Sequence, residues 1–337
     1  MKNLLFLLCM IALSWSCSSS SEGEPEPEPV PEEPKEYLVS LGLTGEIDIE
    51  ESPLSKASSN DLYGIQVYSK TSTTEYTPYA YGLFDDKSLM TVKVLEGYNY
   101  KFIATMIVNG KNKIEYSLDS YSYPFAAGDN FMKLTNNFTF SNNDDIYQID
   151  RGEAILAGYD RFKGNFKVPN TERFYGETEG YIPLENGNIS INMKRVCFGA
   201  KFIADGLTEG NLKINIKEAP ELNIKYGQTE AQDIFTFAHK RFSSNWSSNS
   251  WTKDDYSETI PVSISWEKAD GAVVPLINKD ITFKRNVLTT ITIKVKDTSI
   301  NNNIDITQES GEMAKGENIT IESGTGLDGN IDPVENQ

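Results

Sequence analysis

The sequence predicts an all-β protein in which two tandem β-sandwiches, with transthyretin-like or Greek-key connections, follow an N-terminal export signal and a tether. Three observations support this fold class. Apolar and polar residues alternate over many short segments, turn-forming residues separate those segments, and no amphipathic helical pattern extends beyond about three turns. The predicted divisions are residues 1–17 for the signal, 18–36 for the tether, and 37–186 and 187–337 for the two sandwiches.

The first 17 residues have the features of an export signal. Lys2 supplies a positive charge, and the apolar run from Leu4 to Leu13 is too short to cross a bilayer as a helix. Small serines precede Cys17, and this junction resembles the lipobox of bacterial lipoproteins, in which the new N-terminal cysteine is acylated. The resemblance implies palmitate or a similar lipid on Cys17 and a place at the cell surface, on the outer membrane.

A stretch of serine, glutamate and proline at residues 18–36 follows the signal. It contains too little apolar surface to fold, and its alternating Glu-Pro run favours an extended chain. At ~3.1 Å per residue it would hold a folded body at most roughly 60 Å from Cys17. The alternative is that these residues are the disordered N-terminus of a secreted protein that carries no lipid.

Composition excludes several classes of function. The formal net charge is −18, which argues against nucleic acid as a partner because affinity for nucleic acid depends on neutralising phosphates. Beyond the signal and its junction the only cysteine is Cys197, and the only histidine is His239, so Cys-pair zinc sites are excluded and every histidine-based triad would need that one residue. We expect no enzymatic activity, no cofactor and no metal; a hydrolase built on paired carboxylates is the weakest alternative.

The leading segment of the first sandwich alternates in residue type from Tyr37 to Glu50. Apolar residues stand at most odd positions and polar residues at the even ones, which predicts a half-buried strand. A polar loop follows at residues 54–60. Further strands are predicted at 62–68, 98–108, 131–140 and 153–159.

Turn signals and later alternations complete the prediction. Asn109-Gly110 indicates a type I′ hairpin whose second strand is 111–118. The acidic, glycine-rich segment 176–187 is predicted to connect the two sandwiches. Strands of the second sandwich are predicted at 188–204, 213–217, 222–226, 234–237, 259–266 and 287–295, with short runs at 304–306 and 319–321.

These features together resemble the fimbrillin-like lipoproteins of Gram-negative surface pili, also called type V pilins. The resemblance rests on the lipoprotein signal with its acidic tether, the leading strand 37–50, the block NISINMKRVCFGAKFIADGL at 188–207, and segment 269–295 with Lys284-Arg285-Asn286 before its last strand. It implies a fimbrial subunit, or an accessory or anchor component, that serves cell adhesion and joins other pilus subunits by β-strand addition.

The family's maturation implies roles for particular residues. A protease would cut after Lys56, so that the mature chain begins at Ala57 and lacks the leading strand. The groove left behind would accept the C-terminal segment of another subunit, for which Asn318–Leu327 is the candidate here. Family members cut by an arginine-specific protease have arginine at the cut site. If the strand and the lipid are kept, the implied role is that of an anchor or terminal subunit.

Two aromatic residues suggest a different function. Trp246 and Trp251 frame a segment rich in serine and asparagine, and exposed indole rings in such a loop could stack on sugars. The alternative function is therefore a surface lipoprotein that binds host or bacterial glycans. The other interpretation is that both tryptophans cap one end of a sandwich. Arg195 interrupts an apolar run and is predicted to be a structural arginine at the junction of the sandwiches.

Overall fold

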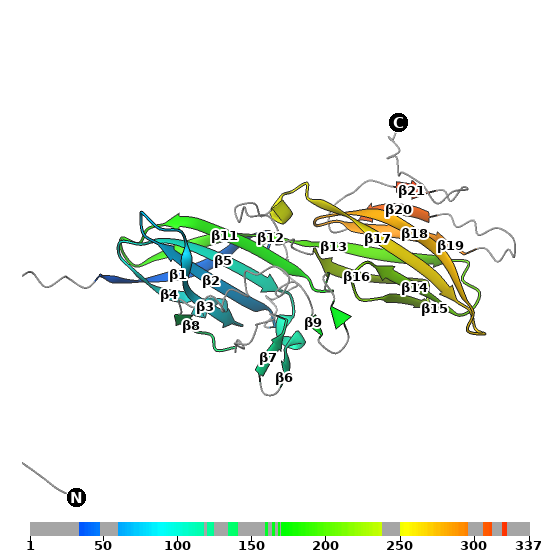
Figure 1. Ribbon diagram of the computed structural model, residues 1–337, viewed down its shortest axis with the longest axis horizontal. Helices are drawn as coiled ribbons and strands as arrows, with labels where there is room; N and C mark the ends of the chain where they lie inside the picture. The colour runs from blue at the N-terminus through cyan, green and yellow to red at the C-terminus, as the bar shows by residue number, and fades with distance from the viewer. Residues whose placement is uncertain are drawn as a thin grey trace, which may run out of the picture. The chain divides into compact units, whose positions relative to one another are not determined.

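The protein is described here from a computed structural model. The described residues are 34–47, 60–117, 120–124, 134–140, 159–160, 164–165, 168, 170–237, 250–295, 306–311 and 319–321. The chain divides into two units, residues 1–34 and 35–337, and all the sheets belong to the second unit. The fold of that unit is all-β, as the sequence predicted, with its sheets packed as sandwiches (Figure 1).

Eight strands form the first hydrogen-bonded set, in the order β4-β1-β12-β11-β5-β2-β3-β8. Neighbouring strands are antiparallel except for β1 and β12, which run parallel. The bounds are β1 Glu36–Gly45, β2 Leu62–Lys70, β3 Thr77–Phe84, β4 Thr91–Leu95, β5 Asn99–Ile107, β8 Phe138–Phe140, β11 Arg173–Tyr181 and β12 Gly187–Arg195.

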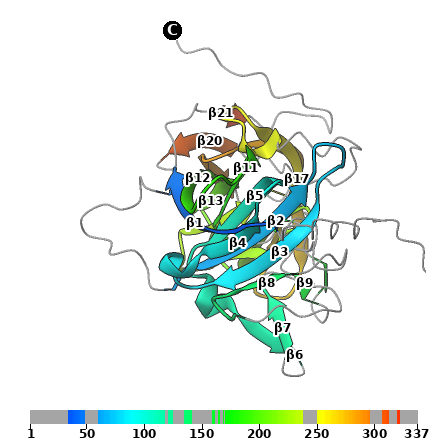
Figure 2. The ribbon, with the colours of Figure 1, turned by 90° about the vertical axis from the view of Figure 1, so that its left-hand side faces the viewer.

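This set of strands forms two layers, which separate along β12. Strand β12 pairs with β1 along Gly187–Met193, but with β11 only at Lys194 and Arg195, so the strands diverge beyond that corner. Apolar side chains of β1, β4 and β12 therefore face those of β2, β3, β5 and β11 across one buried core. Figure 1 and Figure 2 both place β1 beside β4 and β12.

The second set consists of two sheets that enclose another core. A five-stranded sheet has the order β16-β13-β19-β20-β21 and a four-stranded sheet the order β15-β14-β17-β18. As in the first set, one pair is parallel, namely β13 with β19. The bounds are β13 Cys197–Asp205, β14 Asn211–Ile216, β15 Leu222–Lys225, β16 Glu230–Thr236, β17 Ser257–Glu267, β18 Val273–Lys284, β19 Leu288–Lys294, β20 Ile306–Gly311 and β21 Ile319–Ile321.

Small elements lie outside these sheets. Two short pairs are β6 Glu115–Ser117 with β7 Ser120–Tyr123, and β9 Tyr159–Asp160 with β10 Gly164–Asn165; the described single-turn helices are η1 Lys87–Leu89, η2 Gly110–Lys113 and η4 Ser250–Thr252. The predicted hairpin at Asn109-Gly110 is wrong. Asn109 does adopt a left-handed conformation, but η2 follows it, and β5 pairs with β2 and β11 instead of with the returning chain.

Two other sequence-based expectations are wrong because the strands pair with partners that are distant in the sequence. Segment 176–187 does not simply connect the sandwiches, because residues up to Tyr181 continue β11 beside β5. Its glycines and acidic residues resemble a linker, yet Gly176 is needed where the backbone of Asn192 crosses closely. The pairing of β12 with β1 places Gly187–Arg195 in the first set of sheets, whereas the sequence-based division assigned it to the second sandwich.

The leading strand has the predicted alternation but a different end. Val39, Leu41 and Leu43 are at most 8% exposed and point into the core, so the half-buried strand is confirmed. The strand ends at Gly45 instead of continuing to Glu50, because Gly45 has φ of +96°, a conformation that interrupts an extended chain.

Replacing Gly45 with alanine should destabilise the protein by about 1–3 kcal/mol, because an alanine is strained at this φ and its Cβ would overlap the side chain of Asn192 and approach the Met193 carbonyl to 2.8 Å. Gly42→Ala is the matched control, since a Cβ there meets only the Ile189 carbonyl at an ordinary 3.6 Å. Chemical denaturation of both variants measures the difference; equal stabilities would contradict this account of Gly45.

Candidate functional site

The candidate functional site is the place that the leading strand occupies between β4 and β12, here called the seat. Strand β1 pairs in parallel with β12 from Val39 opposite Gly187 to Gly45 opposite Met193, and antiparallel with β4 over Glu36–Ser40. Strand β1 therefore pairs on both sides, with β4 over its first half and with β12 over its second, and the two pairings overlap at Val39 and Ser40. A chain without β1 would expose the facing edges of β4 and β12, which is the arrangement that recruits another strand.

The two faces of β1 have different contacts within the seat. Its inward residues Val39, Leu41 and Leu43 belong to the core of the first sandwich, and burying each is worth about 1.5–3 kcal/mol. On the outward face, the hydroxyl of Thr44 lies 2.9 Å from that of Ser190 on β12. The seat therefore holds β1 by alternate apolar side chains on one face and by backbone pairing with β4 and β12.

A buried arginine closes the end of the seat. The Arg285 side chain, only 3% exposed, donates to both carboxylate oxygens of Glu46 at 2.8 to 3.1 Å and to Asp254 at 2.9 Å. It also donates to the main-chain carbonyls of Lys253 and Arg195. Glu46 directly follows β1, whereas Arg285 lies between β18 and β19. We call Arg285, Glu46 and Asp254 the clamp, which ties the leading strand to the second set of sheets.

The clamp is arranged to hold an ionised glutamate. Burial by itself would raise the pKa of Glu46, but hydrogen bonds from Arg285 and from the Arg195 amide, together with the positive charges of Arg285 and Lys194, outweigh it and hold the pKa below its ordinary value. The exposed carboxyl of Asp254 also has a lowered pKa, first because of its hydrogen bond from Lys194.

Arg195 has the structural role that the sequence predicted. Its guanidinium donates to the Asn286 side chain at 2.7 Å and pairs with Glu172 at 2.8 Å, and it lies over the ring of Phe174. These partners come from the β18–β19 turn, from the residue before β11 and from β11 itself. The arginine therefore joins strands of the first set to a turn of the second.

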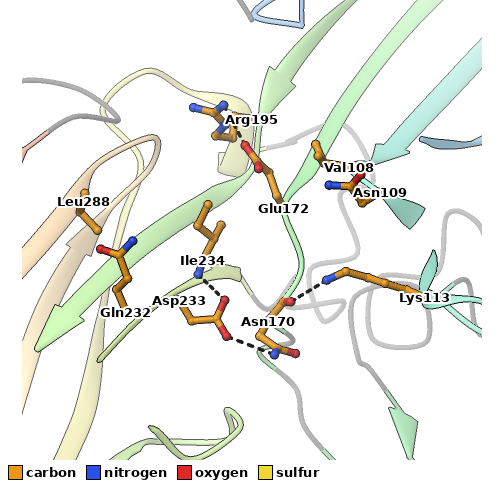
Figure 3. A pocket seen from close by; sticks show the side chains of 10 residues that line it. All are labelled: Val108, Asn109, Lys113, Asn170, Glu172, Arg195, Gln232, Asp233, Ile234 and Leu288. Carbon is orange, nitrogen blue, oxygen red and sulfur yellow. Dashed lines mark hydrogen bonds and ion pairs between the residues drawn. The ribbon is translucent and has the colours of Figure 1, made fainter. Parts of the chain in front are cut away.

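A cavity of about 580 Å³ lies beside this arginine (Figure 3). Figure 3 shows hydrogen bonds from Lys113 to the Asn170 carbonyl at 3.1 Å and from the Asn170 amide to Asp233 at 3.2 Å, besides the Glu172–Arg195 pair. The cavity is lined by Val108, Asn109, Lys113, Asn170, Glu172, Arg195, Gln232, Asp233, Ile234 and Leu288. Its charged groups thus already bond to one another or to the main chain.

Burial shifts two of the charged groups in that cavity toward neutrality. It raises the pKa of Glu172, to which the charge of Asp61 adds, and it lowers the pKa of Lys113. The lining therefore contains charged groups of both signs, with Glu172 and Asp233 beside Lys113 and Arg195.

Cys197 is a buried thiol at the start of β13. It accepts a hydrogen bond from the Arg173 amide at 2.9 Å and lies within hydrogen-bond distance of the Thr171 and Arg173 carbonyls. Burial raises the pKa of this thiol to about 11. The position of Cys197 inside an apolar run of the sequence predicts a small buried residue, and its burial confirms this. Because the thiolate is the reactive form, the raised pKa makes this thiol unreactive.

Of the predicted site residues, only Trp251 lies within the described part of the chain. Cys17, Lys56, Ala57 and Trp246 all lie outside the described residues, as does His239. Trp251 is described; it is 4% exposed and its ring packs against Tyr175 with centroids 5.0 Å apart. An indole covered in this way has no face on which a sugar could stack, so Trp251 is corrected to a packing residue. The donor candidate 318–327 is described only at β21, which pairs with β20.

The clamp itself was missed by sequence reasoning. In the sequence, Lys284-Arg285-Asn286 stands out only through a family resemblance. Glu46 is one of the polar residues at the even positions of an alternating strand. Glu46 and Arg285 of the clamp are 239 positions apart. A charged pair of that separation leaves no local pattern, so only the fold brings it together.

Among the described residues, no group of three or more histidine, cysteine, aspartate or glutamate side chains is placed to hold a metal ion. No helix in the described part of the chain is long and apolar enough to cross a bilayer.

Comparisons with known proteins give structural similarities only. No family model matches the chain, and no curated protein matches it. The fimbrial anchor protein Mfa2 from Porphyromonas gingivalis is 8% identical over 82% of this chain and 97% of its own, with a TM-score of 0.37. A proposed cell adhesion protein from Bacteroides eggerthii is 9% identical over 84% and 97%, with a TM-score of 0.36.

A third solved structure has a different described role. A proposed polysaccharide-binding protein from Bacteroides thetaiotaomicron is 11% identical over 80% of this chain and 95% of its own, with a TM-score of 0.36. At these identities and TM-scores the similarities assign no function to this chain.

The clamp predicts an acid dependence of stability. Because the folded-state pKa of Glu46 is lowered, its contribution is present above the ordinary value of 4.5 and is lost as the pH falls through the folded-state value. Glu46→Gln should therefore flatten the fall in the free energy of unfolding below about pH 4.5. Glu36→Gln, which removes an exposed carboxylate from the same strand, is the control. A slope for Glu46→Gln equal to those of the wild type and of this control would contradict the role of Glu46.

Cys197 should be unreactive in the folded protein. A thiol-modifying reagent applied at neutral pH to the chain beginning at Ser18 should label nothing until denaturant is added, and should then label one thiol, because only the unfolded chain exposes Cys197 and forms its thiolate. The thiol of free cysteine is the control for reagent activity. Labelling of the native protein at a rate near that of free cysteine would show that the site opens.

Proposed function

We propose that this chain is a cell-surface subunit of a pilus, or its anchor component, which joins other subunits by β-strand exchange and contributes to adhesion without enzymatic activity. The observation that supports this proposal most is the position of β1, the first of the described strands, inside the sheet between β4 and β12. A first strand can leave a fold in one piece after a single cut, which an internal strand cannot do.

The seat has properties that suit strand exchange. Removal of β1 would empty the positions of three buried side chains, Val39, Leu41 and Leu43, and would expose two strand edges at once. Strand β12, which forms one of these edges, would stay paired with β11 at Lys194 and Arg195. Edge β4 is held from the facing layer, because the Tyr100 hydroxyl accepts a hydrogen bond from the Leu95 amide at 2.8 Å. An incoming strand would therefore meet two edges that each keep a contact with the rest of the fold.

The chain between the seat and the next strand contains the proposed cut. Lys56 and Ala57 lie between Ile47 and Asn60, the nearest described residues. A cut after Lys56 would release the tether, β1 and Glu46 together, and with them any lipid on Cys17. The exposed groove would then accept another subunit, and repeated head-to-tail addition of this kind builds an open filament. An uncut chain would stay on the outer membrane through its lipid, as an anchor does.

The N-terminus of protein recovered from the cell surface tests this proposal. We expect a mature chain that begins at Ala57, and a Lys56→Ala variant that keeps its first strand and forms no sodium dodecyl sulfate-resistant ladder, because no seat is opened. Lys70→Ala, which changes another lysine near the end of β2, is the control and should be processed normally.

Other N-termini have distinct meanings. A blocked, acylated Cys17 in all molecules would support the anchor role and exclude the processed subunit. Soluble, unacylated protein that begins near Ser18 and never assembles would refute both roles.

A further inference from the structure

We infer that Glu46 fastens the junction of the two sandwiches, so that a chain without Glu46 releases the connection between β16 and β17 from the first sandwich. The part of that connection concerned is Ser250–Tyr256, here called the arm. The cut after Lys56, which would remove Glu46 together with β1, belongs to the proposed function on which this inference rests. The fastening itself needs only contacts of the uncut chain.

The arm leaves the second set of sheets and packs on the first. Its Trp251 is 4% exposed and lies in a small apolar cluster with buried side chains from β2, β5, β11 and the residue after β12. Those side chains are Tyr68, Ile103, Tyr175 and Val196. This cluster is separate from the core that β1 closes. A buried indole therefore ties the arm to the first sandwich, independently of the leading strand's own packing.

The arm continues from this indole into the clamp. The main-chain carbonyl of Lys253 accepts a hydrogen bond from Nε of Arg285 at 2.8 Å. The carboxylate of Asp254 accepts from Arg285 at 2.9 Å and from Nζ of Lys194 at 3.2 Å. Nζ of Lys194 also lies 3.4 Å from a carboxylate oxygen of Glu46. Both cations that hold the arm are therefore paired with Glu46 as well.

Glu46 supplies most of the compensation for the buried charge of Arg285. It accepts hydrogen bonds from both terminal nitrogens of the guanidinium at 2.8 to 3.1 Å. The side chain of Asp254 is 82% exposed, so its pairing with the arginine is weakened by water. Without Glu46 a guanidinium that is 3% exposed would lack its main partner, which is strongly destabilising. Departure of the arm, which is bonded to that guanidinium, admits the water that relieves this charge.

The seat and the junction of the sandwiches therefore depend on one residue. Glu46 directly follows β1, so the arm is docked while β1 fills the seat, and it is free when β1 and Glu46 have left. Such a coupling is reciprocal, because undocking the arm must weaken the hold on the end of β1 by the same free energy. The uncut chain is rigid at the junction, and the cut chain gains a hinge there.

Quenching of tryptophan fluorescence by acrylamide measures whether the arm is docked. In the chain that begins at Ser18, Trp246→Phe leaves Trp251 and Trp266, each 4% exposed. Adding Glu46→Ala should raise the quenching of Trp251 about threefold or more, because the unpaired charge of the clamp drives the arm off. Glu36→Ala is the matched control, since it removes an exposed carboxylate from the same strand but away from the clamp.

Two further variants show which tryptophan responds and why. Replacing Trp251 by phenylalanine leaves Trp266, which lies in the core of the second sandwich, and Glu46→Ala should then change nothing. Adding Arg285→Met to Glu46→Ala removes the unpaired charge and should return the quenching of Trp251 to within about twofold of the parent. A gap left by the shortened side chain at position 46 would not be repaired in this way.

The outcomes separate this inference from the proposed function. Equal protection of Trp251 in Glu46→Ala and in Glu36→Ala overturns the coupling and leaves the proposed function intact, because neither a cut nor strand exchange enters the measurement. A matching rise in the quenching of Trp266 would mean general unfolding and also overturns the coupling. Quenching that Arg285→Met fails to lower overturns the buried charge as its cause. Surface protein that is never cut refutes the processed subunit while the fastening by Glu46 stands.

Discussion

The insertion of β1 between β4 and β12 is the constraint on which the first sandwich depends. Strand β4 has no other partner in the sheet, and β12 pairs with β11 only at its last two residues, so one layer of the sandwich is assembled around β1. The core beneath it is closed by the inward side chains of the same strand. Because β1 precedes the other strands of this layer, a single cut in the chain after it would separate it from them.

The clamp gives this strand a defined end. Buried ion pairs contribute less to stability than their Coulomb energy suggests, since both charges lose their hydration, but they penalise any arrangement that separates them. The Arg285 side chain donates to two carboxylates and two main-chain carbonyls. Loss of Glu46 would leave Asp254 as the one carboxylate of the clamp that pairs with this guanidinium. Gly45 acts with it, because its positive φ turns the chain so that Glu46 can reach the arginine.

Local patterns predicted much of the fold and little of the candidate site. The alternation from Tyr37 onward specified a half-buried strand with Val39, Leu41 and Leu43 inside, and similar alternations located β2, β5, β17 and β19. Turn and linker signals were less reliable. Asn109-Gly110 and segment 176–187 have the composition of a hairpin and a connection, but pairing with distant strands decided their structures.

The sequence by itself determined the fold class, the inward face of β1 and the burial of Cys197, because each follows from residue type and spacing within a few positions. The tertiary structure decided which strands are neighbours, why Gly45 must be a glycine and which arginine meets Glu46. Those facts depend on contacts between residues far apart in the chain, such as Gly45 with Met193 and Glu46 with Arg285.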